Sequence, residues 1–322
     1  MAGLAVGSRG TFAIALVVWA GCERSAPANV EAGEVLGTAF EPGAAALAEG
    51  SDGRDVDSPS DERPVLQLQF DAVRGGRTLR CDDDVAAGAW VLRDLLLYVH
   101  EAAWWGADGV RRPLVLVDEE VWQRDGVALL DFAGGDNGCV MSQTAAMNTD
   151  LTFEWPPSDV APTHLEFRIG VPFGLNHRDP TLNRGPLAAM FMHWGWRGGY
   201  KFVRLEGTGE TRFSLHLGST GCTGPMSAVE GCTEPGQRLV RLPWTGPAQT
   251  VVLDVGALVN ARLASGESCM GNPDGEGGPC SDAWRALAPE GDRAAADGSG
   301  DGSGGGSQRA LAPQTGAWST RP

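Results

Sequence analysis

Short apolar or alternating segments, separated by turn residues, recur through the middle of the chain. In residues 66–70, Leu66, Leu68 and Phe70 alternate with two glutamines, the period-two pattern of a strand with one buried face. Similar segments follow at 91–99, 113–117, 127–132, 165–171, 200–205, 213–217, 238–242 and 250–255. Strands bounded by Gly, Pro, Asn and Asp at this spacing predict an all-β fold, a single antiparallel β-sandwich or barrel-like domain.

Helices are predicted to be minor. One short helix is expected from Pro186 to Met192, and Ser281 can cap the free N–H groups of another that ends near Leu287. The common nucleotide-binding, zinc-protease and hydrolase motifs do not occur in the sequence. The run Gly-Ser-Thr-Gly at 218–221 is interpreted as a tight turn that delivers Cys222 to its partner.

Composition divides the chain into a folded middle and two unlike ends. Residues 23–64 carry ten Asp and Glu against three Arg, with few large apolar residues, and such a segment cannot bury enough surface to offset its ordering entropy. It is predicted to be a disordered acidic tether. Residues 289–322 contain a Gly/Ser-rich run and are predicted to be a disordered tail. Residues 65–288 then form the β domain.

The first 22 residues have the order of a secretory signal. Arg9 precedes the apolar run 11–19, which is too short to span a bilayer, and Ala20 and Gly21 follow. A small pair directly before Cys22 resembles a bacterial lipobox, so Cys22 is predicted to carry a lipid and to become the mature N-terminus. Ordinary signal cleavage nearby is the alternative. We expect an exported lipoprotein, periplasmic or on the cell surface, held to the outer membrane by its lipid alone.

Cysteine parity agrees with export. Setting Cys22 aside from the seven cysteines leaves an even set: Cys81, Cys139, Cys222, Cys232, Cys269 and Cys280. In an oxidising compartment these predict up to three disulfides, although six cysteines allow about 15 connectivities. We expect near neighbours to pair, 222 with 232 and 269 with 280, leaving 81 with 139. A four-cysteine zinc site is the competing interpretation, but structural zinc sites usually use tighter pairs.

The charge balance argues against nucleic acid as a partner. The formal net charge is −16, and Lys201 is the single lysine. A strongly acidic surface is repelled by a phosphate backbone.

Imidazole and thioether groups suggest a soft-metal site. The five histidines are His100, His164, His177, His193 and His216. His216 alternates with Leu215 and Leu217 and therefore faces away from the apolar core, and His177 lies in a loop rich in turn residues. Met190, Met192 and Met226 lie nearby in the sequence. Imidazoles with thioethers favour copper, particularly Cu(I), over hard cations.

An aromatic motif lies between these two histidines. Residues 190–202 carry Trp194, Trp196, Tyr200 and Phe202 at even positions, and if the segment is extended the two Trp indoles lie on one face. An aromatic stripe that fills the mouth of a barrel is the purely structural alternative. Two functional alternatives also remain: a carbohydrate- or peptide-binding module that uses a Trp platform, and a secreted hydrolase that uses carboxylates such as Asp254 and Glu267.

Five motifs in order resemble one known family over nearly all of residues 65–288. They are WQRDGVALLDF (122–132), GVPFGLNH (170–177), HWGWRGGYKFVRLEG (193–207), FSLHLGSTGC (213–222) and CMGNPDGEGGPC (269–280). Together they resemble the MbnP-like copper-binding proteins, also called metallo-mystery pair four-Cys proteins. Arg197 departs from the pattern, because many members have Gln directly after the Trp-x-Trp motif.

The resemblance implies a copper-binding protein, not an enzyme, that acts with a dihaem partner of the MbnH, MauG and cytochrome c peroxidase type. The partner would oxidise Trp194 to kynurenine, on which the binding of one copper ion would depend. The matching motifs make His177 and His216 the expected ligands, with His100 as a weaker third. Trp196 and Met190 are expected to lie beside the site. His193 is ranked lower, since it would point away from Trp194.

Overall fold

The computed structural model describes residues 64–86, 90–133, 139, 146–195, 197–210, 212–226, 228–259, 263, 265–271, 279–287 and 316–322. They belong to one compact unit, Ser60–Pro322. The predicted signal, Cys22 with its predicted lipid, nearly all of the predicted tether and Trp196 lie outside the described residues. No helix in the described part of the chain is long and apolar enough to cross a membrane.

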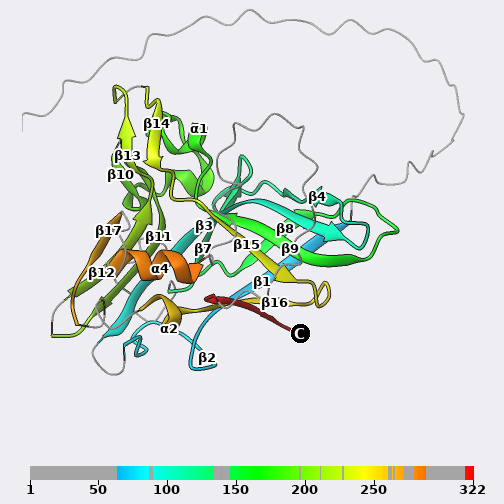
Figure 1. The fold of residues 1–322 in the computed structure, drawn as a ribbon, viewed down its shortest axis with the longest axis horizontal. Coiled ribbons are helices and arrows are strands. Elements are labelled where there is room, and N and C mark those ends of the chain that lie inside the picture. Colours follow the sequence, from blue (N-terminus) through cyan, green and yellow to red (C-terminus); the bar gives the residue numbers. More distant parts are fainter. Residues whose placement is uncertain are drawn as a thin grey trace, which may run out of the picture. The chain divides into compact units, whose positions relative to one another are not determined.

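Two large β-sheets form the sandwich, and β13 (Thr220–Thr223) pairs with β14 (Gly231–Glu234) in a separate two-stranded ribbon (Figure 1). The smaller sheet has the strand order β18-β16-β1-β8-β5, with β2 attached to β1. Its strands are β18 (Trp318–Arg321), β16 (Thr250–Asp254), β1 (Val65–Arg74), β8 (Asp150–Glu154), β5 (Val115–Leu116) and β2 (Arg77–Thr78). The pairing is antiparallel except between β1 and β16.

The larger sheet carries the candidate site. Its main path is β15-β9-β3-β11-β12-β17, with β4, β7 and β10 attached at its sides and β6 paired to β7. The strands are β15 (Arg238–Pro243), β9 (Pro162–Ile169), β3 (Val91–Gly106), β11 (Gly199–Thr208), β12 (Arg212–Gly218), β17 (Cys269–Gly271), β4 (Arg111–Pro113), β7 (Val127–Asp131), β10 (His193–Gly195) and β6 (Gln123–Arg124). Only β12 and β17 are parallel among the described pairs of this sheet.

The two sheets pack face to face through aromatic side chains. Phe70 of β1 contacts Phe167 of β9 edge-on, with ring centroids 5.8 Å apart, and Trp318 of β18 contacts the same ring at 5.4 Å. All three are almost completely buried. The predicted all-β sandwich is therefore confirmed, and every predicted strand segment overlaps an observed strand. The segment 113–117 spans the end of β4 and all of β5, and β8 and several shorter strands, among them β10 and β17, were not predicted.

The C-terminal end differs from the sequence prediction. Residues 318–321 were placed in a disordered tail, but they form β18, which pairs antiparallel with Thr250–Leu253 of β16. Trp318 is only 4 % exposed. Burial of Trp318 stabilises this strand in the sheet even though the sequence before it is rich in Gly and Ser. Residues 318–321 therefore belong to the domain.

Helices are short, as predicted. They are α1 (Phe173–Asn176), α2 (Val255–Leu258) and α4 (Pro279–Leu287), with 3-10 turns η1 (Pro180–Leu182), η2 (Gly185–Ala188) and η3 (Met190–Met192). The helix expected over 186–192 is instead the two turns η2 and η3. Asp254, a candidate hydrolase carboxylate, accepts the Gly256 N–H at 2.9 Å and so caps α2.

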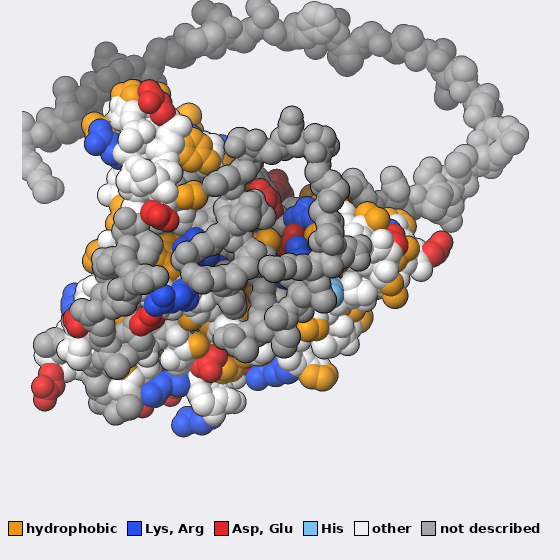
Figure 2. Space-filling view, in the orientation of Figure 1, with side chains coloured by type: hydrophobic (Ala, Val, Ile, Leu, Met, Phe, Trp, Pro, Cys, Tyr) orange, Lys and Arg blue, Asp and Glu red, His pale blue; other side chains and the backbone are white. Residues whose placement is uncertain are grey.

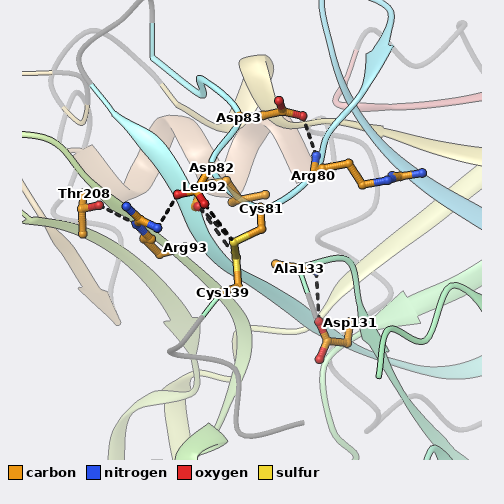
Figure 3. Close-up of a disulfide and its surroundings, with 10 residues drawn as sticks. All are labelled: Arg80, Cys81, Asp82, Asp83, Leu92, Arg93, Asp131, Ala133, Cys139 and Thr208. Atoms are coloured by element: carbon orange, nitrogen blue, oxygen red, sulfur yellow. Dashed lines mark hydrogen bonds and ion pairs between the residues drawn. A yellow bond between two sulfur atoms is a disulfide. The ribbon is translucent and has the colours of Figure 1, made fainter. Parts of the chain in front are cut away.

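Three disulfides join the six cysteines in the expected pairs. Around Cys81–Cys139, the Leu92 carbonyl lies 4.0 and 3.9 Å from the two sulfur atoms, and Arg93 next to it pairs with Asp82 (Figure 3). Such crosslinks are typical of proteins exported from the reducing cytosol. Acidic and basic side chains both occur on the face drawn in Figure 2, so the net acidity is not one uniform acidic surface.

Candidate metal centre

The Trp-x-Trp segment does not continue as one extended strand. β10 pairs His193 with Tyr200 and Gly195 with Gly199, so the chain reverses at once into β11. Trp194 and Tyr200 consequently do not share a strand face: Tyr200 is fully buried, whereas Trp194 is partly exposed. The one extended segment that a shared aromatic face requires is therefore not formed, because the chain turns at Arg197 and Gly198 before β11 begins at Gly199.

Trp194 lies on a seat made by two glycines. A Cβ atom added at Gly218 would be 2.6 Å from Cζ3 of the indole, and one added at Gly271 would be 3.6 Å from Cη2. Gly218 ends β12 and Gly271 ends the parallel strand β17. A side chain at Gly218 would therefore push the indole away, and the absence of one fixes where the indole packs.

One side of Trp194 borders an open pocket of about 520 Å³. The pocket is lined by Trp194, Arg197, Gly198, Ser219, Thr220, Gly221, Cys222, Met270 and Gly271. Met270 is 60 % exposed and pairs in register with His216. An indole at this position is within reach of a large partner or a small ligand.

His216 lies next to Trp194, with ring centroids 6.5 Å apart. It points away from the apolar core, as predicted, yet it is only 5 % exposed. Its Nε2 is 2.8 Å from Oε1 of Glu206 on β11, and Nδ1 is buried with no hydrogen-bond partner among the described residues. Burial lowers the pKa of His216, and the bond to His216 lowers the pKa of Glu206. The pair is therefore a neutral imidazole that donates from Nε2 to a carboxylate, which leaves a lone pair on Nδ1.

Further charged groups hold this carboxylate. Arg204 is 3.2 Å from Glu206 and forms a second ion pair of 2.8 Å with Asp94 on β3. Burial raises the pKa of Asp94 to about 7, although Arg204 opposes the shift. Phe191, from η3, covers Arg204 in a cation–π contact with 5.4 Å to the ring centroid. The site thus rests on a buried ionic network that the 190–194 segment covers.

His177 lies on the far side of a disulfide from the pocket. Cys222 lines the pocket and is bonded to Cys232, whose sulfur is 3.4 Å from Nε2 of His177. His177 is 8 % exposed. Asn176 donates to Nε2 at 3.0 Å and to Ser219 at 3.2 Å. His216 thus contacts Trp194 directly, whereas His177 is linked to the pocket only through the Cys222–Cys232 disulfide among the described contacts.

His193 and His100 take other positions. His193 packs edge-on against Tyr200, with centroids 4.8 Å apart, while burial and the nearby His177 lower its pKa. His100 is buried in β3, 3.9 Å from the Glu101 carboxylate, and burial lowers its pKa to about 4. The described contacts do not connect His100 with Trp194. Met190 is 53 % exposed on η3.

The sequence analysis missed several contributors. Glu206 and Asn176 orient the two histidines, Gly218 and Gly271 seat the indole, and Met270 lines the pocket. Alternation along 200–208 could have suggested Glu206, because Arg204 and Glu206 fall on one strand face. No local signal places Met270 opposite His216, since their pairing joins distant segments.

The arrangement defines a disulfide-stapled β-sandwich in which one buried imidazole, His216, lies beside a partly exposed tryptophan, and a second, His177, lies beside the Cys222–Cys232 disulfide. The buried, unpartnered Nδ1 of His216 is a donor that suits a soft or borderline metal ion.

Comparison with known proteins identifies the family. The MbnP family model matches residues 63–271, well over half of the chain, and the chain belongs to this family. A solved structure, MbnP from Methylosinus trichosporium, is similar with a TM-score of 0.55 and 24% sequence identity, covering 70% of this chain and 89% of that one. A comparison with curated protein sequences gives no match.

Proposed function

We propose that this protein binds one copper ion, as Cu(I), at a site that forms when a dihaem partner of the MbnH and MauG type oxidises Trp194 to kynurenine. Family membership supports the copper association. The observation that carries the proposal is the placement of Trp194 beside the free Nδ1 of His216, at the edge of an open pocket.

Oxidation of the indole supplies the donor atoms that the unmodified side chain lacks. The lone pair of the indole nitrogen belongs to the π-system, and its N–H is only a donor. Opening the ring creates an aromatic amine and a ketone. With Nδ1 of His216 and the imidazole of His177 these groups form the ligand set that we propose, and such nitrogen donors suit copper.

The pocket gives the partner access to its target. Trp194 is partly exposed, and Arg197 and Met270 stand at the same opening. A haem oxidant can remove electrons from an indole that it approaches closely, whereas a fully buried Trp would need a relay. Trp196 is the candidate for such a relay.

Export fits this role. The three disulfides agree with an extracytoplasmic location, and we propose attachment to the outer membrane through a lipid on Cys22. The proposed role is to bind copper and not to catalyse a reaction. Its own residues hold the ion and present Trp194, and the chemistry belongs to the partner.

Substitution of Gly218, against which Trp194 packs, tests this proposal. Gly218→Ala places a methyl group where the indole packs, so the variant, after treatment with the haem partner, should show less kynurenine and less bound copper than the wild-type protein. Gly231→Ala is the matched control: Gly231 also lies in a strand, and a Cβ atom there meets nothing within 4 Å. If a folded Gly218→Ala protein is modified and loaded like the control, the assignment of Trp194 to the site fails.

A further inference from the structure

One of the three disulfides differs from the others in its surroundings. Cys222 and Cys232 join β13 (Thr220–Thr223) to β14 (Gly231–Glu234), and both are partly exposed. Each of the other two disulfides has at least one cysteine that is almost fully buried, Cys139 in one and Cys269 in the other. A reductant in solution therefore reaches the 222–232 bond most easily.

The nitrogen that faces this disulfide carries a lone pair. Oδ1 of Asn176 accepts the backbone N–H of Tyr200 at 2.7 Å, which fixes the orientation of the amide. The NH₂ group of Asn176 is then the one that points at Nε2 of His177. Nε2 must accept, so His177 is protonated on Nδ1 and its lone pair lies beside Cys232.

The distances match a metal site once the sulfur–sulfur bond is open. Nε2 of His177 and the sulfur atoms of Cys222 and Cys232 all lie within 4.8 Å of one another. Across a tetrahedral ion with bonds of about 2.0 Å to nitrogen and about 2.3 Å to sulfur, nitrogen and sulfur stand about 3.5 Å apart. The observed nitrogen-to-sulfur distance is 3.4 Å. The two sulfurs must separate to about 3.8 Å, and the Asn176 N–H must give up its hydrogen bond to Nε2 so that the lone pair can bind the ion.

We propose that Cys222–Cys232 is a thiol switch: a dithiol reductant opens it, and the two cysteines with His177 then bind one thiophilic cation of the Zn²⁺ type. The reductant transfers two electrons and two protons, becomes a disulfide itself, and leaves two thiols. Binding of the ion displaces both thiol protons and forms two metal–thiolate bonds and one metal–imidazole bond. The adjoining pocket, which Cys222 lines, supplies water as the fourth ligand.

This site does not depend on kynurenine. It requires reduced sulfur, whereas the proposed copper site is expected in the oxidised, partner-treated protein. His177 is common to both, so the two are alternative states of one neighbourhood, and each can fail without the other.

Co²⁺ is a suitable probe because thiolate ligation gives it a near-ultraviolet charge-transfer band. Full-length mature protein made without the haem partner is reduced with a phosphine, which leaves no competing thiol. Alkylation and mass mapping identify the opened pair. The reduced protein should bind one Co²⁺ with a thiolate band that Zn²⁺ displaces, and the oxidised protein should show no band.

Variants separate this site from other thiols. Cys222→Ser with Cys232→Ser should abolish the band, His177→Gln should weaken Co²⁺ binding at least tenfold, and His164→Gln should leave it unchanged. The proposal is overturned if the double serine variant keeps the band, or if mapped, reduced 222 and 232 give none. It is also overturned if the pair cannot be reduced without unfolding the domain.

Discussion

Glu206→Gln tests how the protein prepares His216 for a metal ion. The substitution keeps the size of the side chain and an acceptor oxygen, but it removes the charge that receives the Nε2 proton at 2.8 Å. A hydrogen bond to a charged group contributes about 1.5–3 kcal/mol, against about 0.5–1.5 kcal/mol for a neutral one. The difference, about 1–1.5 kcal/mol, predicts a loss of roughly tenfold in copper affinity, at the lower end of the range for residues that orient a metal-binding histidine.

A competition titration against a Cu(I) chelator, on partner-treated protein with kynurenine confirmed by mass, measures this loss. Glu210→Gln is the control, because Glu210 is exposed between β11 and β12. Stability should change in a defined direction as well. The pKa of Glu206 is lowered below its ordinary 4.5, so its contribution is present above that pH and is lost as pH falls through the lowered value. Glu206→Gln should therefore lose less stability on acidification. Equal copper affinity in both variants would refute the reasoning.

Three further outcomes follow from the structure. Trp318→Ala should lower the free energy of unfolding, measured with urea, by about 3–5 kcal/mol, because it removes a buried indole that packs against Phe167. An unchanged unfolding midpoint would mean that β18 does not contribute to the core. Asp94→Asn should flatten the decline of stability between pH 4 and about 7, because over this range the Asp94 carboxyl, with its pKa raised to about 7, keeps its proton in the folded state while it ionises in the unfolded state. A pH profile like that of wild type would contradict this. His164→Ala should leave the copper stoichiometry unchanged, because the His164 ring lies at the start of β9 and its described contact is with Thr163, not with the candidate site. A loss of bound copper in this variant would show that His164 belongs to the site.

Much of the fold was predictable because strand alternation is local. Leu66, Leu68 and Phe70 mark β1 without any tertiary information, and cysteine parity with short spacing gave the disulfide pairs. β18 was not predictable from composition, since its place depends on Trp318 reaching a core that lies far away in sequence.

The site was predictable only in part. His216 was assigned to the correct strand face, but Trp194 lies beside it from β10, and the turn that pairs β10 with β11 was not predicted. Glu206 approaches His216 because β11 and β12 pair in one particular register. The contact of His177 with Cys232 likewise needs the β13–β14 hairpin in place.

Peptide mapping of copper-loaded protein tests the central claim most directly. Mature protein co-produced with the proposed dihaem partner should carry copper and a peptide in which Trp194 is heavier by about 4 Da, the net gain of one oxygen and loss of one carbon that turns Trp into kynurenine. Protein made without the partner should contain plain Trp194 and bind copper poorly. Full copper occupancy beside an unmodified Trp194 would contradict the account.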